Sequence, residues 1–112
     1  MSDIFKGVCP VINTPFNQHG TIDYDSLQNI IEYVLRAGCK SIALYAFNSE
    51  PHKMTLEEKQ SVTEFFLGTV ASRAKTLIGI IENSLSQAIE QAQRARTHNA
   101  DALIIYPPTF FM

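Results

Sequence analysis

The chain has 112 residues, of which 46% are hydrophobic and 18% are charged, a composition typical of one globular domain and not of a disordered segment. Nine basic residues are scattered among eleven acidic ones, so the net charge of −2 excludes an extended basic surface for nucleic acid or for an anionic membrane. No apolar run reaches the roughly 20 residues of a membrane span and the first ten residues lack the apolar core of a signal peptide, so we expect a cytoplasmic protein.

The first third of the chain predicts a short strand followed by a helix. Residues 7–13 form a short apolar run that favours a strand, with Pro10 near its start, where a missing N–H is tolerated. Asp23 is a good helix N-cap and Gly38 suits the position just after a helix end. Between them, apolar residues recur at helical spacing, namely Leu27, Ile30, Ile31, Val34 and Leu35. This stripe predicts an amphipathic helix.

The stretch 41–58 is the one around which the chain is organised. Residues 42–46 read as a buried strand, and residues 48–52 are polar turn formers. Thr55 and Glu58 then form the capping-box pattern of a helix start. In a parallel α/β fold such a loop lies at the carboxyl end of a strand, where these folds bind ligands. The helix that follows carries Val62, Phe65, Phe66 and Val70 on one face.

The last third of the chain repeats the same order of a strand, a polar loop and a capped helix. Residues 76–81 predict a third strand, and Ser84 with Gln87 gives another capping-box pattern. The helix that follows has an inner stripe of Ala88, Ile89, Ala92 and Ala95, and Asn99 suits a left-handed helix end. Residues 102–106 predict a fourth strand, which ends before Pro107 and Pro108.

Alternation of helices with continuously apolar strands is typical of a parallel sheet covered by helices, as in a barrel or a doubly wound sheet. No strand is followed by a G-x-G-x-x-G pattern, which makes a dinucleotide-binding fold the weaker option. Cys9 and Cys39 stand in or beside apolar runs, far apart in the sequence, and we expect two buried thiols. The three histidines have no ligand spacing, so no metal site is expected.

Four motifs in register carry a family resemblance. They are residues 7–27 (GVCPVINTPFNQHGTIDYDSL), the segment 49–58 with its Ser49-Glu50 and Met54-Thr55-Leu56-Glu57-Glu58, Ile78-Gly79 with Asn83-Ser84, and residues 99–103 (NADAL). Together they resemble the dihydrodipicolinate synthase and N-acetylneuraminate lyase family over essentially all 112 residues. The resemblance implies a (β/α)8 barrel that binds pyruvate or another 2-keto acid as a Schiff base on a lysine, and then makes or breaks a carbon–carbon bond.

A complete barrel of this type takes about 250 residues. We therefore expect a single domain, residues 1–112, that is the N-terminal half of a TIM-type parallel barrel with about four strands and three helices. The family's proton-relay tyrosine and Schiff-base lysine would then lie beyond Met112, so no catalytic residue is assigned within the chain, and we expect it to be inactive alone. The resemblance further implies a small 2-keto acid as substrate, no cofactor, and a homo-oligomer, with no nucleic-acid or membrane partner.

The resemblance also names the site residues. The family holds the keto-acid carboxylate with a loop of the form G-[TS]-[TS]-G-E after the second strand, where this chain reads Ala46-Phe47-Asn48-Ser49-Glu50. Phe47 and Asn48 would contact the substrate, and Ser49 and Glu50 would support the loop. Phe47 replaces a hydroxyl with an apolar ring, whereas the Asn48 amide can still donate. We expect a different keto acid or a weakened function. Lys53 is the one lysine on this loop, and we expect it to be a solvated charge.

A second hypothesis is a non-catalytic half-barrel that self-associates as a binding module. Four strands taken from an eight-stranded barrel leave two open edges and an uncovered apolar end at residues 104–112. Two copies could together close eight strands.

Overall fold

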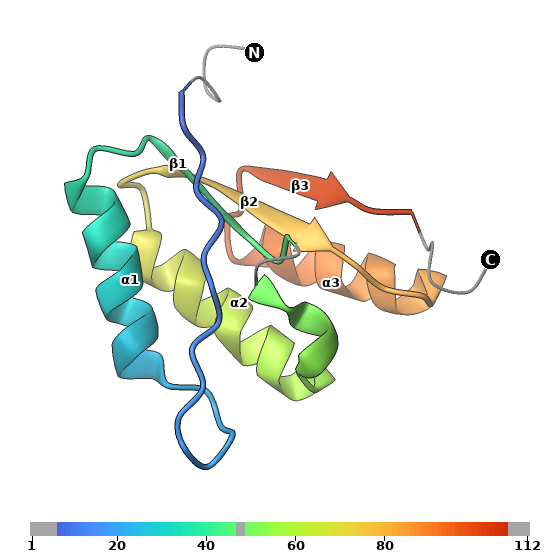
Figure 1. Ribbon diagram of the computed structural model, residues 1–112. Helices are drawn as coiled ribbons and strands as arrows, with labels where there is room; N and C mark the ends of the chain where they lie inside the picture. The colour runs from blue at the N-terminus through green and yellow to red at the C-terminus, as the bar shows by residue number, and fades with distance from the viewer. Residues whose placement is uncertain (1–6, 47–48, 108–112) are drawn as a thin grey trace.

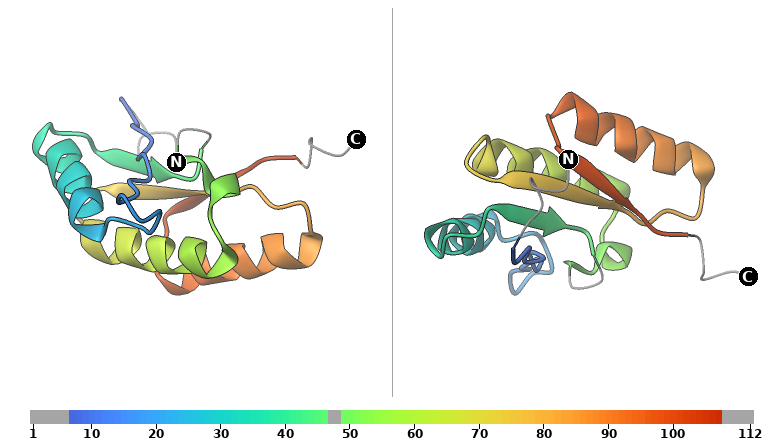
Figure 2. Two further views of the ribbon diagram at one scale, coloured as in Figure 1. Left: turned by 60° about the horizontal axis from the view of Figure 1, so that its bottom comes forward. Right: turned by 90° about the horizontal axis from the view of Figure 1, so that it is seen from above.

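The computed structural model describes residues 7–46 and 49–107. Along the chain lie α1 (Tyr24–Arg36), β1 (Ser41–Leu44), a short 3-10 helix (Pro51–Lys53), α2 (Leu56–Val70), β2 (Lys75–Ile80), α3 (Leu85–Thr97) and β3 (Ala102–Ile105). The strands form one parallel sheet in the order β1-β2-β3 (Figure 1). The helices α2 and α3 lie side by side along one face of it, with α1 next to α2 (Figure 2). The predicted α/β partial barrel is confirmed.

Local capping signals placed the helix ends correctly. The Asp23 carboxylate accepts a hydrogen bond from the Ser26 N–H at the start of α1, and Thr55 and Glu58 form both bonds of the capping box of α2. Ser84 caps α3. Asn99 has a φ of 70° just beyond α3, the left-handed conformation predicted for it. These signals act within a few residues, which is why the sequence alone reveals them.

The predicted strand over residues 7–13 is wrong in extent. It is reduced to one parallel bridge between Val11 and Ala43, held by two backbone hydrogen bonds of 2.9 Å. In these bonds the Ala43 N–H donates to the Pro10 carbonyl and the Ile12 N–H donates to the Ala43 carbonyl. The bond that would continue the ladder, from the Tyr45 N–H to the Ile12 carbonyl, is not formed because a side chain takes both groups. The other three strands appear where predicted, each ending before its predicted last residue.

The core lies between the helices and the face of β1 and β2 that they cover. Ile42, Leu44, Ile78 and Ile80 from the strands pack there with the predicted stripes of α1 and α2. The remaining core side chains from these helices include Leu27, Ile31, Val62, Phe66 and Val70, all fully buried. Hydrophobic burial of this kind is the main favourable contribution to folding.

The predicted inner stripe of α3 needs one correction. Ile89 is 48% exposed, whereas Gln91 is buried together with Ala95. Gln91 and Ala95 are one helical turn apart and define the face that meets the sheet, which leaves Ile89 on the flank of the helix. The expectation for the cysteines was also only partly correct, since both thiols are free but half-buried. None of the helices in the described part of the chain is long and apolar enough to cross a membrane.

Gly79 marks the tightest contact between neighbouring strands. A Cβ atom at this position would lie 2.0 Å from the Tyr45 carbonyl oxygen, far inside van der Waals contact. The chain leaving β1 therefore passes directly over β2, and only glycine leaves room for it.

We expect Gly79→Ala to lower the free energy of unfolding by about 1–3 kcal/mol, because the added methyl group overlaps backbone that has no space to move. Gly68→Ala is the matched control, since Gly68 lies within α2 and no atom lies within 4 Å of the place that an added methyl group would take. That control should raise the free energy of unfolding by roughly 0.5–1 kcal/mol through helix propensity. Urea unfolding followed by circular dichroism measures both values. Equal effects of the two substitutions would contradict the close approach.

Candidate functional site

The candidate site lies at the carboxyl ends of β1 and β2, where parallel α/β folds carry their ligand-binding loops. We call this region the rim, which comprises residues 45–46 and 49–54 after β1 and residues 81–84 after β2. Two residues of the rim, Tyr45 and Glu50, have left-handed φ angles of 66° and 52°. Such angles are unfavourable for residues other than glycine and persist only where surrounding contacts enforce them. The contacts that enforce them begin at Ser49.

The Ser49 hydroxyl replaces one hydrogen bond of the sheet. It accepts a bond of 2.9 Å from the Tyr45 N–H and donates one of 2.5 Å to the Ile12 carbonyl, which are the two groups that a regular ladder would join directly. Ser49 has 0% exposure, so neither group can turn to water instead. Its hydroxyl therefore ends the β pairing and satisfies both buried backbone groups at once.

Ser49 is joined to the N-terminal segment by a second hydrogen bond. The Thr14 hydroxyl donates a hydrogen bond of 2.6 Å to the Ser49 carbonyl. Three stretches thus meet at one residue, namely the N-terminal segment, the end of β1 and the loop that begins after it. We call this set of hydrogen bonds at Ser49 the serine bridge.

Tyr45 anchors the rim to α2 through its side chain. The ring is 4% exposed, and its hydroxyl donates a hydrogen bond of 2.5 Å to the Lys59 carbonyl and lies 3.2 Å from the Thr63 hydroxyl. Burial raises the pKa of the Tyr45 phenol above its ordinary value, with smaller and opposing contributions from Thr63. The phenol thus remains neutral and keeps donating to α2 across the physiological range.

A buried ion pair joins the second helix to the loop after β2. The Lys59 ammonium contacts the Glu82 carboxylate, and the two side chains are only 13% and 8% exposed. Glu82 stands two residues after the last residue of β2, so this pair fixes the second half of the rim to α2, the helix to which Tyr45 of the first half is also hydrogen-bonded. Sequence reasoning missed it, because a helix lysine and a loop glutamate 23 residues apart match no spacing rule.

The predicted site residues fall in different places. Phe47 and Asn48, the expected substrate contacts, lie outside the described residues. Ser49 is the centre of the serine bridge, and the Glu50 carboxylate lies 3.0 Å from the Lys53 ammonium, with both side chains substantially exposed. Their role in supporting a substrate loop stays a prediction. Lys53 is a solvent-facing charge at this position.

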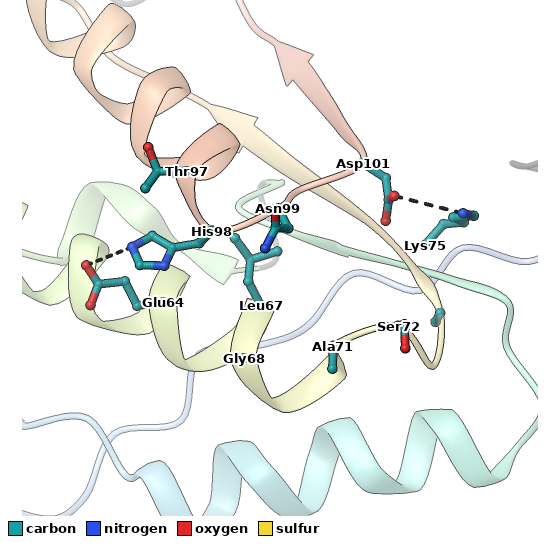
Figure 3. A pocket seen from close by; sticks show the side chains of 11 residues that line it. Glu64, Leu67, Gly68, Ala71, Ser72, Lys75, Thr97, His98, Asn99 and Asp101 are labelled. Atoms are coloured by element: carbon teal, nitrogen blue, oxygen red, sulfur yellow. Dashed lines mark ion pairs between the residues drawn. The ribbon is translucent and has the colours of Figure 1, made fainter.

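A hollow lies at the end of the sheet opposite the rim, near the amino ends of β2 and β3. It has a volume of about 610 Å³ and is lined by the ends of α2 and α3 (Figure 3). Its ionisable side chains lie next to one another in pairs, with Glu64 3.3 Å from His98 and Lys75 4.0 Å from Asp101. This end of a parallel barrel serves stability, so the rim is the better candidate. Across residues 7–46 and 49–107, no three His, Cys, Asp or Glu side chains are arranged to hold a metal ion.

A model of the dihydrodipicolinate synthetase family matches residues 4–112. The chain belongs to this family. The 4-hydroxy-tetrahydrodipicolinate synthase of Thermoanaerobacter sp. (strain X514) is 32% identical over 107 residues, which is 96% of this chain and 36% of that protein. The corresponding enzyme of Staphylococcus saprophyticus is 32% identical over 98% of this chain and 37% of its own length.

Solved structures of dihydrodipicolinate synthases agree in fold. The enzyme from Bacillus clausii superposes with a TM-score of 0.92 at 25% identity, over 99% of this chain and 38% of that one. The enzyme from Aquifex aeolicus gives a TM-score of 0.84 at 30% identity, over 90% of this chain and 34% of that one. The chain therefore spans somewhat more than a third of the length of these dihydrodipicolinate synthetase family members.

The resemblance set out above aligns residues 46–50 with the family motif G-[TS]-[TS]-G-E, and in that alignment the serine bridge is a contact that the motif does not supply. Ser49 stands where that motif has its second glycine, and a glycine has no hydroxyl with which to join the Tyr45 N–H to the Ile12 carbonyl. This dihydrodipicolinate synthetase family member therefore holds the end of β1 by a contact that a glycine cannot make.

We expect Ser49→Ala to lower the free energy of unfolding by about 2 kcal/mol, because it leaves a buried N–H and a buried carbonyl without a partner. Ser61→Ala, on the exposed side of α2, is the matched control and should change that free energy by less than about 0.5 kcal/mol. Chemical denaturation of both variants measures the difference. If the two substitutions have the same effect, the serine bridge does not stabilise the rim.

Proposed function

We propose that this chain is the N-terminal part of a lyase barrel that binds pyruvate or a related 2-keto acid as a Schiff base and makes or breaks a carbon–carbon bond. The observation that carries the proposal is the family match over residues 4–112, which includes the whole rim. The curated relatives that match are named 4-hydroxy-tetrahydrodipicolinate synthase. A cytoplasmic location and a homo-oligomeric state form part of the proposal.

In this proposal the loop after β1 binds the carboxylate of the keto acid. The Asn48 amide donates to the carboxylate, and the Phe47 ring lines the pocket in place of a hydroxyl. Ser49 and Glu50 support the loop. The proposal draws support from the buried serine bridge, which fixes the residue directly after Asn48 to two other segments.

The reactive amine is proposed to come from outside these 112 residues. A Schiff-base lysine needs an accessible, desolvated amine in the pocket. Among the described lysines, Lys59 forms an ion pair with Glu82, and Lys53 is exposed beside Glu50. Lys40 and Lys75 stand at the amino ends of β1 and β2, opposite the rim. The chain alone is therefore expected to be inactive.

The alternative is a non-catalytic half-barrel that binds a second copy of itself. Its support is the exposure of Leu103 and Ile105 on β3, the open edge of the described sheet. Light scattering of the isolated chain distinguishes the two: a discrete, soluble dimer supports the alternative, whereas aggregation or a molten species supports an N-terminal part that needs the rest of its barrel.

A chimeric enzyme tests the proposed function. Residues 7–107 replace the matching segment of the Thermoanaerobacter synthase, and borohydride then traps pyruvate for detection by mass spectrometry. We expect an adduct on a lysine of the synthase portion and none on this chain's lysines. Asn48→Ala should raise the pyruvate concentration for half-maximal trapping by about tenfold, the effect of losing one hydrogen bond to a charged group.

Asn29→Ala, on the exposed side of α1, is the matched control and should leave trapping unchanged. Circular dichroism establishes that each chimera is folded. A folded chimera that traps no pyruvate, or an adduct at Lys53, would contradict the proposal.

A further inference from the structure

Gln91 is a buried polar side chain of α3 whose amide lacks a hydrogen-bond partner. The residue is 6% exposed, and its side-chain nitrogen Nε2 makes no hydrogen bond to any described residue. Buried donors are nearly always paired, because an unpaired donor gives up its hydrogen bonds to water and gains none in return. The Gln91 amide therefore needs an acceptor that the described residues do not supply.

The unpaired amide borders a small cavity beneath the rim. The cavity lies between the end of β2, α2 and α3 and has a volume of about 10 Å³. Its lining comprises Tyr45, Pro51, Lys59, residues 78–82 and Gln91. The side chains of Tyr45, Ile78 and Ile80 are buried, so these walls are closed to solvent. Because about 10–15 Å³ is the smallest space that holds a water molecule, the cavity has room for one.

The Lys59–Glu82 ion pair borders the same cavity and has unused hydrogen-bonding capacity. The Lys59 ammonium contacts Oε2 of the Glu82 carboxylate. An ammonium has more than one N–H and a carboxylate has several lone pairs, so this contact leaves donors on Lys59 and acceptor sites on Glu82. A buried ion pair is stabilising only when such remaining groups are also hydrogen-bonded. Donors and an acceptor thus surround one cavity.

Charge and size together select the occupant of this cavity. Lys59 and Glu82 carry opposite charges that compensate each other, so the cavity favours neither a cation nor an anion. A metal ion also needs oxygen lone pairs, whereas Gln91 presents an N–H. Water is neutral, fits the volume, and can accept from the amide while it donates to the carboxylate.

We propose that one buried water molecule occupies this cavity, accepts a hydrogen bond from Gln91 Nε2 and donates one to the Glu82 carboxylate. Buried waters make about three hydrogen bonds, and the Lys59 ammonium can supply the third. The water joins α3 to the ion pair that fixes the loop after β2 to α2. One chain of hydrogen bonds then holds two helices and half of the rim, whichever ligand the rim binds.

Nuclear magnetic resonance of the full 112-residue chain tests this inference through magnetisation transfer from water. A water held inside a protein gives nuclear Overhauser effects of the opposite sign to those from surface water, because it stays longer than the molecule takes to tumble. We expect such effects at the side-chain amide protons of Gln91, at a mildly acidic pH where the Lys59 ammonium exchanges slowly with solvent. Gln93 is the matched control, since it is exposed on the same helix and should show surface water alone.

Unfolding of two methionine variants gives a second, independent readout. Methionine matches glutamine in length and in helix propensity but cannot donate a hydrogen bond. We expect Gln91→Met to lower the equilibrium constant for folding about fivefold, the usual effect of losing one hydrogen bond. Gln93→Met should change that constant by less than about twofold. Urea denaturation followed by circular dichroism measures both.

Two results would overturn the inference. The first is the absence of a long-lived water at the Gln91 amide in the unaltered chain. The second is a Gln91→Met variant that is as stable as the unaltered chain or more stable, because replacing an amide that is unpaired in the folded state removes a cost and no bond.

Discussion

The Ser49 hydroxyl stands between the Tyr45 N–H and the Ile12 carbonyl, two groups that would otherwise bond directly as the next step of a parallel ladder. Because Ser49 is fully buried, breaking either bond would leave a backbone group with no partner. The sheet therefore stops at this point, and the chain after β1 is free to turn. The loop proposed to bind the keto acid starts within this turn.

The other features of the rim follow from that turn. Tyr45 adopts a left-handed backbone there, which brings its carbonyl against Gly79 of β2 and directs its ring down to α2. The Lys59–Glu82 pair then fixes the loop after β2 to the same helix. The Ser49 hydroxyl on the Tyr45 N–H, the phenol bond to the Lys59 carbonyl and the close approach to Gly79 thus over-determine the unfavourable backbone at Tyr45, which is the condition under which such conformations persist.

The sequence predicted the fold wherever the information is local. Caps at Asp23, Thr55 and Ser84, and the left-handed Asn99, depend on neighbours a few residues away, and the structure has all four, with the capping box complete at Thr55 and its serine half formed at Ser84. The two predictions that failed depend on contacts between residues distant in the sequence. Ile89 matched a helical stripe, yet it lies away from the face of α3 that Gln91 and Ala95 turn to the sheet, and it is 48% exposed. The strand over residues 7–13 failed because a serine distant in sequence takes its next partner.

The sequence predicted less of the candidate site for the same reason, because the contacts that hold it are long-range. The resemblance to a family pointed to the loop after β1, but the loop's anchoring through Thr14, Tyr45 and Ser49 joins segments up to 37 residues apart and appears only in three dimensions. The same holds for Ile89, Leu103 and Ile105, which lie in a predicted helix stripe or strand but are exposed in the structure.

The serine bridge is tested most directly by hydrogen exchange at the Tyr45 amide, measured by nuclear magnetic resonance. The Tyr45 N–H lies beyond the last residue of β1 and has no carbonyl partner in the ladder, so its protection depends on the Ser49 hydroxyl. If the hydroxyl holds the end of the strand, this amide exchanges as slowly as those within β1, and Ser49→Gly removes the protection at Tyr45 while protection at Ala43 remains. Rapid exchange of the Tyr45 amide in the unaltered chain, or protection that survives Ser49→Gly, would contradict the account.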